Sequence, residues 1–108
     1  MKENLLKIIN HYGLMEQLKY IHSEYFELDE AIFEERAYQM QENEVLPTNF
    51  YINNIIEEIA DVLVMLRQIQ YYYGILDEYV EAVMNYKIAR QLDRIKGEYN
   101  EIKWWRIK

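Results

Sequence analysis

The stretch INNIIEEIADVLVMLRQI, residues 52–69, decides the fold of this 108-residue chain. Its apolar residues recur at intervals of three and four, which is the spacing of one face of an α-helix. That face is wide, which indicates burial on more than one side. Two acids, Glu58 and Asp61, lie three residues apart within the stretch. Residues at this spacing are neighbours on a helix surface, so the two carboxylates point the same way.

Helical spacing also governs the rest of the chain, which contains only three glycines and one proline. We expect four helices: one over residues 3–11, one from Leu14 to about Glu42, one that is capped by Thr48 or Asn49 and stops near Gly74, and one with Asp77 as its N-cap. Gly13, Gly74 and Gly97 should end helices, and Pro47 disfavours helix in the residue before it. Because no strand alternation competes anywhere, the sequence predicts an all-α, four-helix-type bundle that comprises residues 1–108 as a single domain.

The composition of the chain argues against several classes of protein. The net charge of -7 argues against a protein that binds the nucleic-acid backbone, which would need a basic surface. The chain has no cysteine, so disulfides and thiolate zinc sites are excluded. No apolar run reaches the roughly 20 residues that span a bilayer. The first residues, including Lys2 and Glu3, lack the layout of a signal peptide, so we expect a cytoplasmic protein with no membrane partner.

A second acidic pair, Glu24 and Glu27, repeats the three-residue spacing on the expected 14–42 helix. On a helix each residue is rotated by about 100° from the one before it. The angular positions of the acids can thus be counted from Ile59 on the third helix and from a stripe through Leu18 and Tyr25 on the second. Both pairs then lie to the same rotational side of their stripes. A short connection makes the two helices antiparallel neighbours, and antiparallel packing brings equal offsets to one side. The four acids should therefore converge.

Acidic pairs of this spacing also arise by chance in a chain with 19 acidic residues. The pairs Glu27/Glu30, Glu78/Glu81 and Glu98/Glu101 are examples, and a single pair is more often a solvated helix face. Four converging carboxylates are different, because they repel one another unless a cation lies between them. Mg²⁺ prefers oxygen ligands and keeps several waters, so it is the expected ion, with Mn²⁺ as the alternative.

The two acidic blocks resemble the MazG-like all-α nucleoside triphosphate pyrophosphohydrolases. They read GLMEQLKYIHSEYFELDEAI, residues 13–32, and IIEEIADVLVMLRQI, residues 55–69. That family carries an E-x-x-E pair on one helix and E-x-x-D on the next. Ser23 departs from the pattern, because the family often has a glutamate there. The likeness continues through NYKIARQLDRI, residues 85–95, so it covers most of residues 13–95.

The resemblance implies Mg²⁺-dependent hydrolysis of a nucleoside triphosphate to a monophosphate and pyrophosphate. It implies that Glu24, Glu27, Glu58 and Asp61 are the metal ligands. Glu27 and Glu58 are the candidates for a catalytic role. Glu27 could orient the attacking water as general base instead of binding the metal, and the sequence does not separate these two roles.

Other residues receive roles around this site. Lys87, Arg90 and Arg94 share one face of the last helix, and they either bind the β and γ phosphates or form a solvated basic face. Gln17, two turns before Glu24, could contact the base or ribose, although such a glutamine is more often a polar neighbour of the core. The tail, residues 97–108, is expected to pack on a partner subunit in a homodimer or homotetramer.

Two alternatives stay open at the level of sequence. One is phosphoribosyl-ATP pyrophosphohydrolase, a related enzyme that usually shows a G-K-K-x-x-E-E approach to its first acids, which YIHSEYFEL lacks. The other is a non-catalytic helical module that associates through its aromatic residues. Metal-dependent release of pyrophosphate separates the enzymes from the module.

Overall fold

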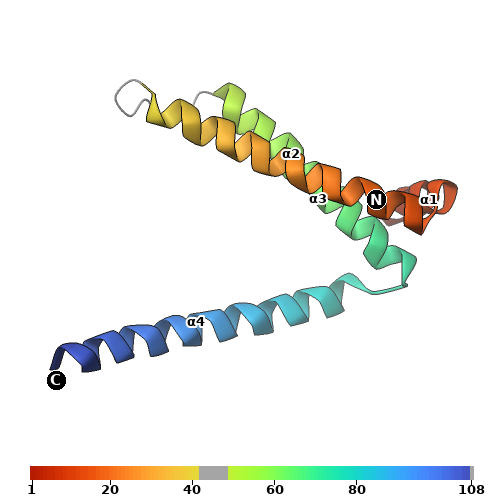
Figure 1. Ribbon diagram of the computed structural model, residues 1–108. Helices are drawn as coiled ribbons and strands as arrows, with labels where there is room; N and C mark the ends of the chain where they lie inside the picture. Colours follow the sequence, from red (N-terminus) through yellow and green to blue (C-terminus); the bar gives the residue numbers. More distant parts are fainter. Residues whose placement is uncertain (42–48, 108) are drawn as a thin grey trace. The chain divides into compact units, whose positions relative to one another are not determined.

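The computed structural model describes residues 1–41 and 49–107, with side chains through residue 98. These residues form four helices and no strand, which confirms the all-α prediction (Figure 1). The helices are α1 Lys2–Tyr12, α2 Leu14–Met40, α3 Asn49–Tyr72 and α4 Asp77–Ile107. Every helix in this part of the chain is too short or too polar to cross a membrane. Pro47, expected to separate the second and third helices, lies outside the described residues.

The chain divides into two compact units, residues Met1–Gly74 and Ile75–Lys108. The first unit contains α1, α2 and α3, and the second contains α4. The expectation of a single domain over residues 1–108 stays a prediction.

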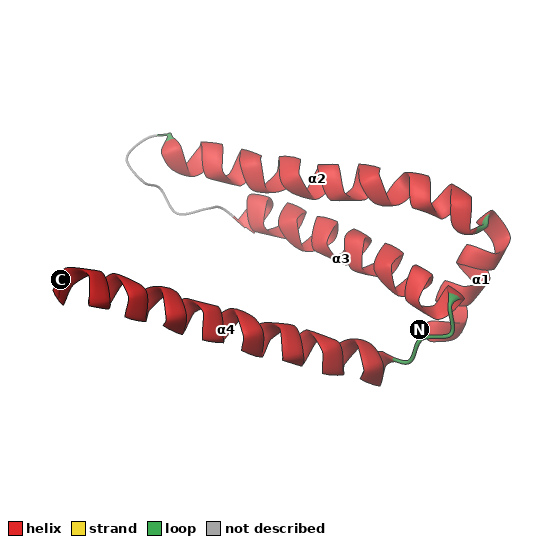
Figure 2. Cartoon of the chain, turned by 60° about the horizontal axis from the view of Figure 1, so that its bottom comes forward, coloured by secondary structure: helices red, strands yellow, loops and turns green. Residues whose placement is uncertain are grey.

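Within the first unit α2 and α3 lie side by side and run in opposite directions, as both views show (Figures 1 and 2). The first helix, α1, packs against α3 and contacts α2. It buries Leu5 and Ile9, and Ile9 is completely enclosed. Gly13 alone joins α1 to α2, with φ 91°, and its N–H donates to the carbonyl oxygen of Ile9 at 2.7 Å. The expected helix end at Gly13 is confirmed, because a positive φ suits glycine.

The contact between α2 and α3 is more polar than the sequence predicts. On α2 the buried residues are Gln17, Ala31 and Glu35. The stripe expected through Leu18 and Tyr25 is confirmed only in part, because Leu18 is half-buried whereas Tyr25 is 59% exposed. Residues 17, 24, 28, 31 and 35 instead follow one face of α2, and all are at least half-buried. The packed face is therefore rotated toward Glu24.

A similar rotation applies to α3. Ile59, taken as the centre of its packed face, is 44% exposed, whereas Val62, Met65 and Gln68 are buried. The apolar side of α3 is wide, and apolar content alone does not indicate which part meets α2. The structure turns the acid-bearing part inward and leaves apolar residues uncovered by α1 and α2.

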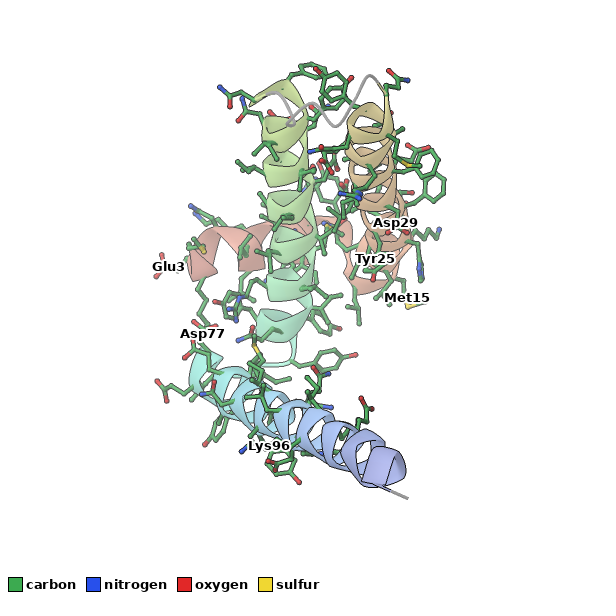
Figure 3. All side chains as sticks on the ribbon, turned by 90° about the vertical axis from the view of Figure 1, so that its left-hand side faces the viewer. Glu3, Met15, Tyr25, Asp29, Asp77 and Lys96 are labelled. Atoms are coloured by element: carbon green, nitrogen blue, oxygen red, sulfur yellow. The ribbon has the colours of Figure 1, made fainter. Side chains whose placement is uncertain are left out.

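The last helix begins with Asp77 in its first turn (Figure 3). A negative charge there is favourable because the helix N-terminus carries partial positive charge. The expected end at Gly97 was wrong, since α4 runs on to Ile107. A glycine inside a helix costs only about 1 kcal/mol relative to alanine, and no proline follows it. The side chains of residues 99–108 are outside the described set, so packing of the tail on a partner stays a prediction.

Candidate metal centre

Four carboxylates from α2 and α3 meet at one place. Glu24 and Glu27 lie one turn apart on α2, and Glu58 and Asp61 lie one turn apart on α3. Each residue offers a carboxylate oxygen, and these four oxygens all lie within 4.8 Å of one another. The predicted convergence is therefore confirmed. The predicted angular offsets were wrong, because the rotated faces place Glu24 and Glu58 in the contact itself and not to one side of it.

Two of these carboxylates each have a buried oxygen atom without a hydrogen-bond partner. Glu24 and Glu58 are half-buried, and the Oε2 atom of each is buried without a hydrogen-bond partner. Burial raises the pKa of Glu24, and repulsion from Glu27 and Asp61 raises it further. The pKa of Glu58 is raised by the same causes in the same order. Buried carboxylates that repel one another are unfavourable, so a cation bound among them would relieve that repulsion.

The donor set fits a hard divalent cation. All four candidate ligands are carboxylates, and the chain has no cysteine that would favour a softer metal. Glu24 and Glu58 form the more enclosed part of the cluster, whereas Glu27 and Asp61 are exposed. The exposed part leaves room for the waters or phosphate oxygens that Mg²⁺ and Mn²⁺ keep in their coordination shells. The residues present therefore fit such an ion.

A second polar contact joins α2 to α3. Gln17 Nε2 donates to Gln68 Oε1 at 2.7 Å, and the two residues are only 6% and 2% exposed. Gln17, considered as a nucleotide contact, thus has its amide engaged inside the helix contact, and its contact with a nucleotide stays a prediction. Gln68 was not identified from the sequence. Its seven-residue distance from Asp61 was an available signal, because seven residues return a helix to nearly the same face.

Three basic residues of α4 lie on one face, as their spacing predicts. Lys87, Arg90 and Arg94 line a small hollow of about 120 Å³ together with Gln91. The guanidinium carbon of Arg90 also lies 5.9 Å from the ring centre of Tyr86. These residues belong to the second unit and the four acids to the first, so their role as a phosphate clamp stays a prediction.

Comparison of the chain with models of protein families, with curated proteins and with solved structures finds no match. A functional interpretation therefore depends on the geometry and chemistry of the cluster, with the motif resemblance beside them.

Proposed function

We propose that this chain is an Mg²⁺-dependent nucleotide pyrophosphohydrolase that cleaves a nucleoside triphosphate to a monophosphate and pyrophosphate. One observation carries the proposal: four carboxylates from two antiparallel helices offer oxygens within 4.8 Å of one another. A triphosphate is itself strongly anionic, so it approaches such a cluster only when divalent cations lie between the two. The resemblance of the acidic blocks to MazG-like enzymes supports the same reaction class.

The burial of the four acids suggests a division of roles. Glu24 and Glu58, each with a buried unpaired oxygen, would hold the ion most firmly, and Asp61 would complete the set. When bound, Mg²⁺ neutralises phosphate charge and makes water more acidic. Glu27 is exposed at the open part of the cluster, so one of its carboxylate oxygens is available to accept the proton of the attacking water. Water then adds across the anhydride bond between the α and β phosphates, and pyrophosphate leaves.

The resemblance to MazG-like enzymes also assigns the basic face of α4 to the phosphates of the substrate. Guanidinium groups stay charged and match phosphate oxygens in pairs. We therefore assign Lys87, Arg90 and Arg94 to the β and γ phosphates, where they would neutralise charge on the leaving pyrophosphate.

The active form is proposed to be a homodimer or homotetramer. Ile56, Leu63 and Leu66 on α3 are 57%, 50% and 48% exposed. They are large apolar side chains on one helix, and a second copy of the chain would remove them from water. A mass that stays at 13.3 kDa at micromolar concentration would overturn this part of the proposal.

The reaction is tested with a panel of nucleoside triphosphates and phosphoribosyl-ATP, with and without Mg²⁺. We expect release of pyrophosphate and the matching monophosphate only with the metal, and its loss in Asp61→Asn with the helical content unchanged. A preference for phosphoribosyl-ATP would favour the related enzyme. A folded wild-type chain that hydrolyses none of the substrates would overturn the proposal in favour of a non-catalytic helical module.

A further inference from the structure

We propose that Gln17 and Gln68 are a positioning pair: their hydrogen bond fixes the register of α2 against α3 and so assembles the carboxylate cluster. This inference deepens the proposed metal site and depends on it for its functional meaning. It assigns the pair a role that neither the acidic motif nor the composition indicates.

The contact is specific and enclosed. Gln17 Nε2 donates to Gln68 Oε1 at 2.7 Å, while Gln68 Nε2 lies 3.8 Å from the sulfur of Met65. Both glutamines are buried. A buried amide without a partner loses its hydration and gains nothing in return, which is unfavourable. The two side chains are therefore satisfied together only when the helices align as they do here.

The same alignment assembles the cluster. Gln17 lies seven residues before Glu24, and Gln68 lies seven residues after Asp61. In an antiparallel pair, equal steps in opposite directions keep residues opposite each other, so the register that pairs the amides also pairs Glu24 with Asp61. Sliding α3 by about one turn would place an apolar or aromatic residue opposite Gln17. That residue would be Val64 for a slide one way and Tyr71 for the other.

Other contacts specify this register weakly. On the packed face of α2 only Ala31 is a buried apolar residue and Leu28 is half-buried, so few apolar side chains of α2 select the register against α3. The four carboxylates repel one another in the absence of a cation and favour separation. Tyr38 and Tyr51 are in contact, with ring centres 4.7 Å apart, but a ring contact is less directional than an amide hydrogen bond. A buried polar pair is a known means of fixing helix register at some cost in stability.

The test removes both amides and keeps the length of the side chains. In Gln17→Met/Gln68→Met we expect helical content to persist and the thermal midpoint to stay level or rise, because no buried amide is left unpaired. Affinity for Mn²⁺, measured by titration calorimetry, should fall about 10-fold or more, as for groups that orient metal ligands. Each single variant should unfold at a lower temperature than the double variant.

A disulfide in the native register should rescue the double variant. Ala31 lies seven residues after Glu24, and Asn54 lies seven residues before Asp61, so Ala31→Cys/Asn54→Cys extends the same alignment in a chain without native cysteine. We expect the oxidised form to recover most of the lost Mn²⁺ affinity and the reduced form to stay weak. Wild-type affinity in the double variant, or no recovery after oxidation, would overturn the proposal.

A metal-independent measurement separates this proposal from the proposed function. If the wild type binds no Mn²⁺, the proposed metal site is wrong. The register of α2 against α3 can still be measured by the yield of an intramolecular disulfide. Ala31→Cys/Asn54→Cys reports the native register, and Ala31→Cys/Glu57→Cys reports a slide of three residues. The proposal requires the second yield to rise relative to the first when the glutamines are replaced by methionine. An unchanged ratio would contradict it.

Discussion

The two sides of α3 differ from those of an ordinary amphipathic helix, because polar residues share the packed side with the buried Val62 and Met65. The side that meets α2 carries Glu58, Asp61 and Gln68, while Ile56 and Leu63 remain half or more exposed to solvent within the described chain. An ordinary surface helix would bury its isoleucines and leave its acids in water. The inner side thus costs stability that the carboxylates would recover on binding a cation, and the outer side retains apolar area for association. The comparison suggests that the contact between α2 and α3 serves a site more than it serves folding.

The largest effect is expected when charge is removed from the contact between α2 and α3. In Glu24→Gln/Glu58→Gln we expect Mg²⁺-dependent pyrophosphate release to fall by about 100-fold or more, because two proposed ligands are lost. The thermal midpoint in chelator should rise by a few degrees, since repulsion and burial of charge are relieved. Loss of activity together with a lower midpoint would show that these acids stabilise the fold.

The outer side is tested by adding charge to it. Leu63→Glu should shift the mass measured by light scattering from an oligomer to a single chain, because a carboxylate would be buried in the proposed interface. Met15→Glu is the matched control: Met15 is 72% exposed and lies on the outer side of α2 (Figure 3). We expect that variant to keep the wild-type mass. An unchanged mass in Leu63→Glu would place the interface elsewhere.

A smaller effect is expected from pH. The pKa values of Glu24 and Glu58 are raised above the usual 4.5 in the folded chain, so the folded state holds these protons more tightly than the unfolded state. Their contribution to stability is present below about pH 4.5 and is lost as the pH rises through the raised pKa values. In chelator, the thermal midpoint should therefore increase as the pH is lowered from 7 toward 5.

Saturating Mg²⁺ should reverse this trend, because the ion binds the ionised carboxylates of the folded chain and competes with protons. Calorimetric scans across the same pH range check both slopes. In Glu24→Gln/Glu58→Gln the difference between the two slopes should shrink. Equal slopes with and without Mg²⁺ in the wild type would argue against ion binding at these acids.

The smallest effect is expected at an acid outside the cluster. Glu98→Gln changes an exposed residue of α4 that belongs to a chance acidic pair. Its turnover should stay within about two-fold of wild type, as for surface substitutions generally. A large loss would mean that acidic spacing alone does not distinguish functional from incidental pairs in this chain.

The helices were accessible from sequence because their boundaries follow local chemistry. Gly13 ends α1, and apolar spacing identifies α2 and α3. The helix end predicted at Gly97 was wrong, because a glycine stops a helix only where the backbone adopts a positive φ. Here α4 continues through Gly97. The orientation of α3 was not accessible, since its wide apolar side offers several equally apolar faces to a neighbour.

The acidic cluster was predictable for a related reason. Residue spacing and antiparallel topology bring the four acids together whether the packed face is centred on Ile59 or nearer Glu58, so an error in rotation did not remove the convergence. The pairing of Gln17 with Gln68 depends on helix register, which spacing within a single helix does not determine. Relating the basic face of α4 to the acids requires the placement of one unit against another, and no local pattern encodes that.

The single-residue joint at Gly13 has a consequence for how this chain can vary. Its φ of 91° would strain any other L-residue, and Gln17 begins the helical bonding of α2 by donating its N–H to the Gly13 carbonyl oxygen at 3.1 Å. An insertion of one residue at this non-helical joint would displace the start of α2 relative to α1, which packs on α3 and encloses Ile9. Homologous sequences that preserve the cluster should accordingly keep both the glycine and the length of this corner.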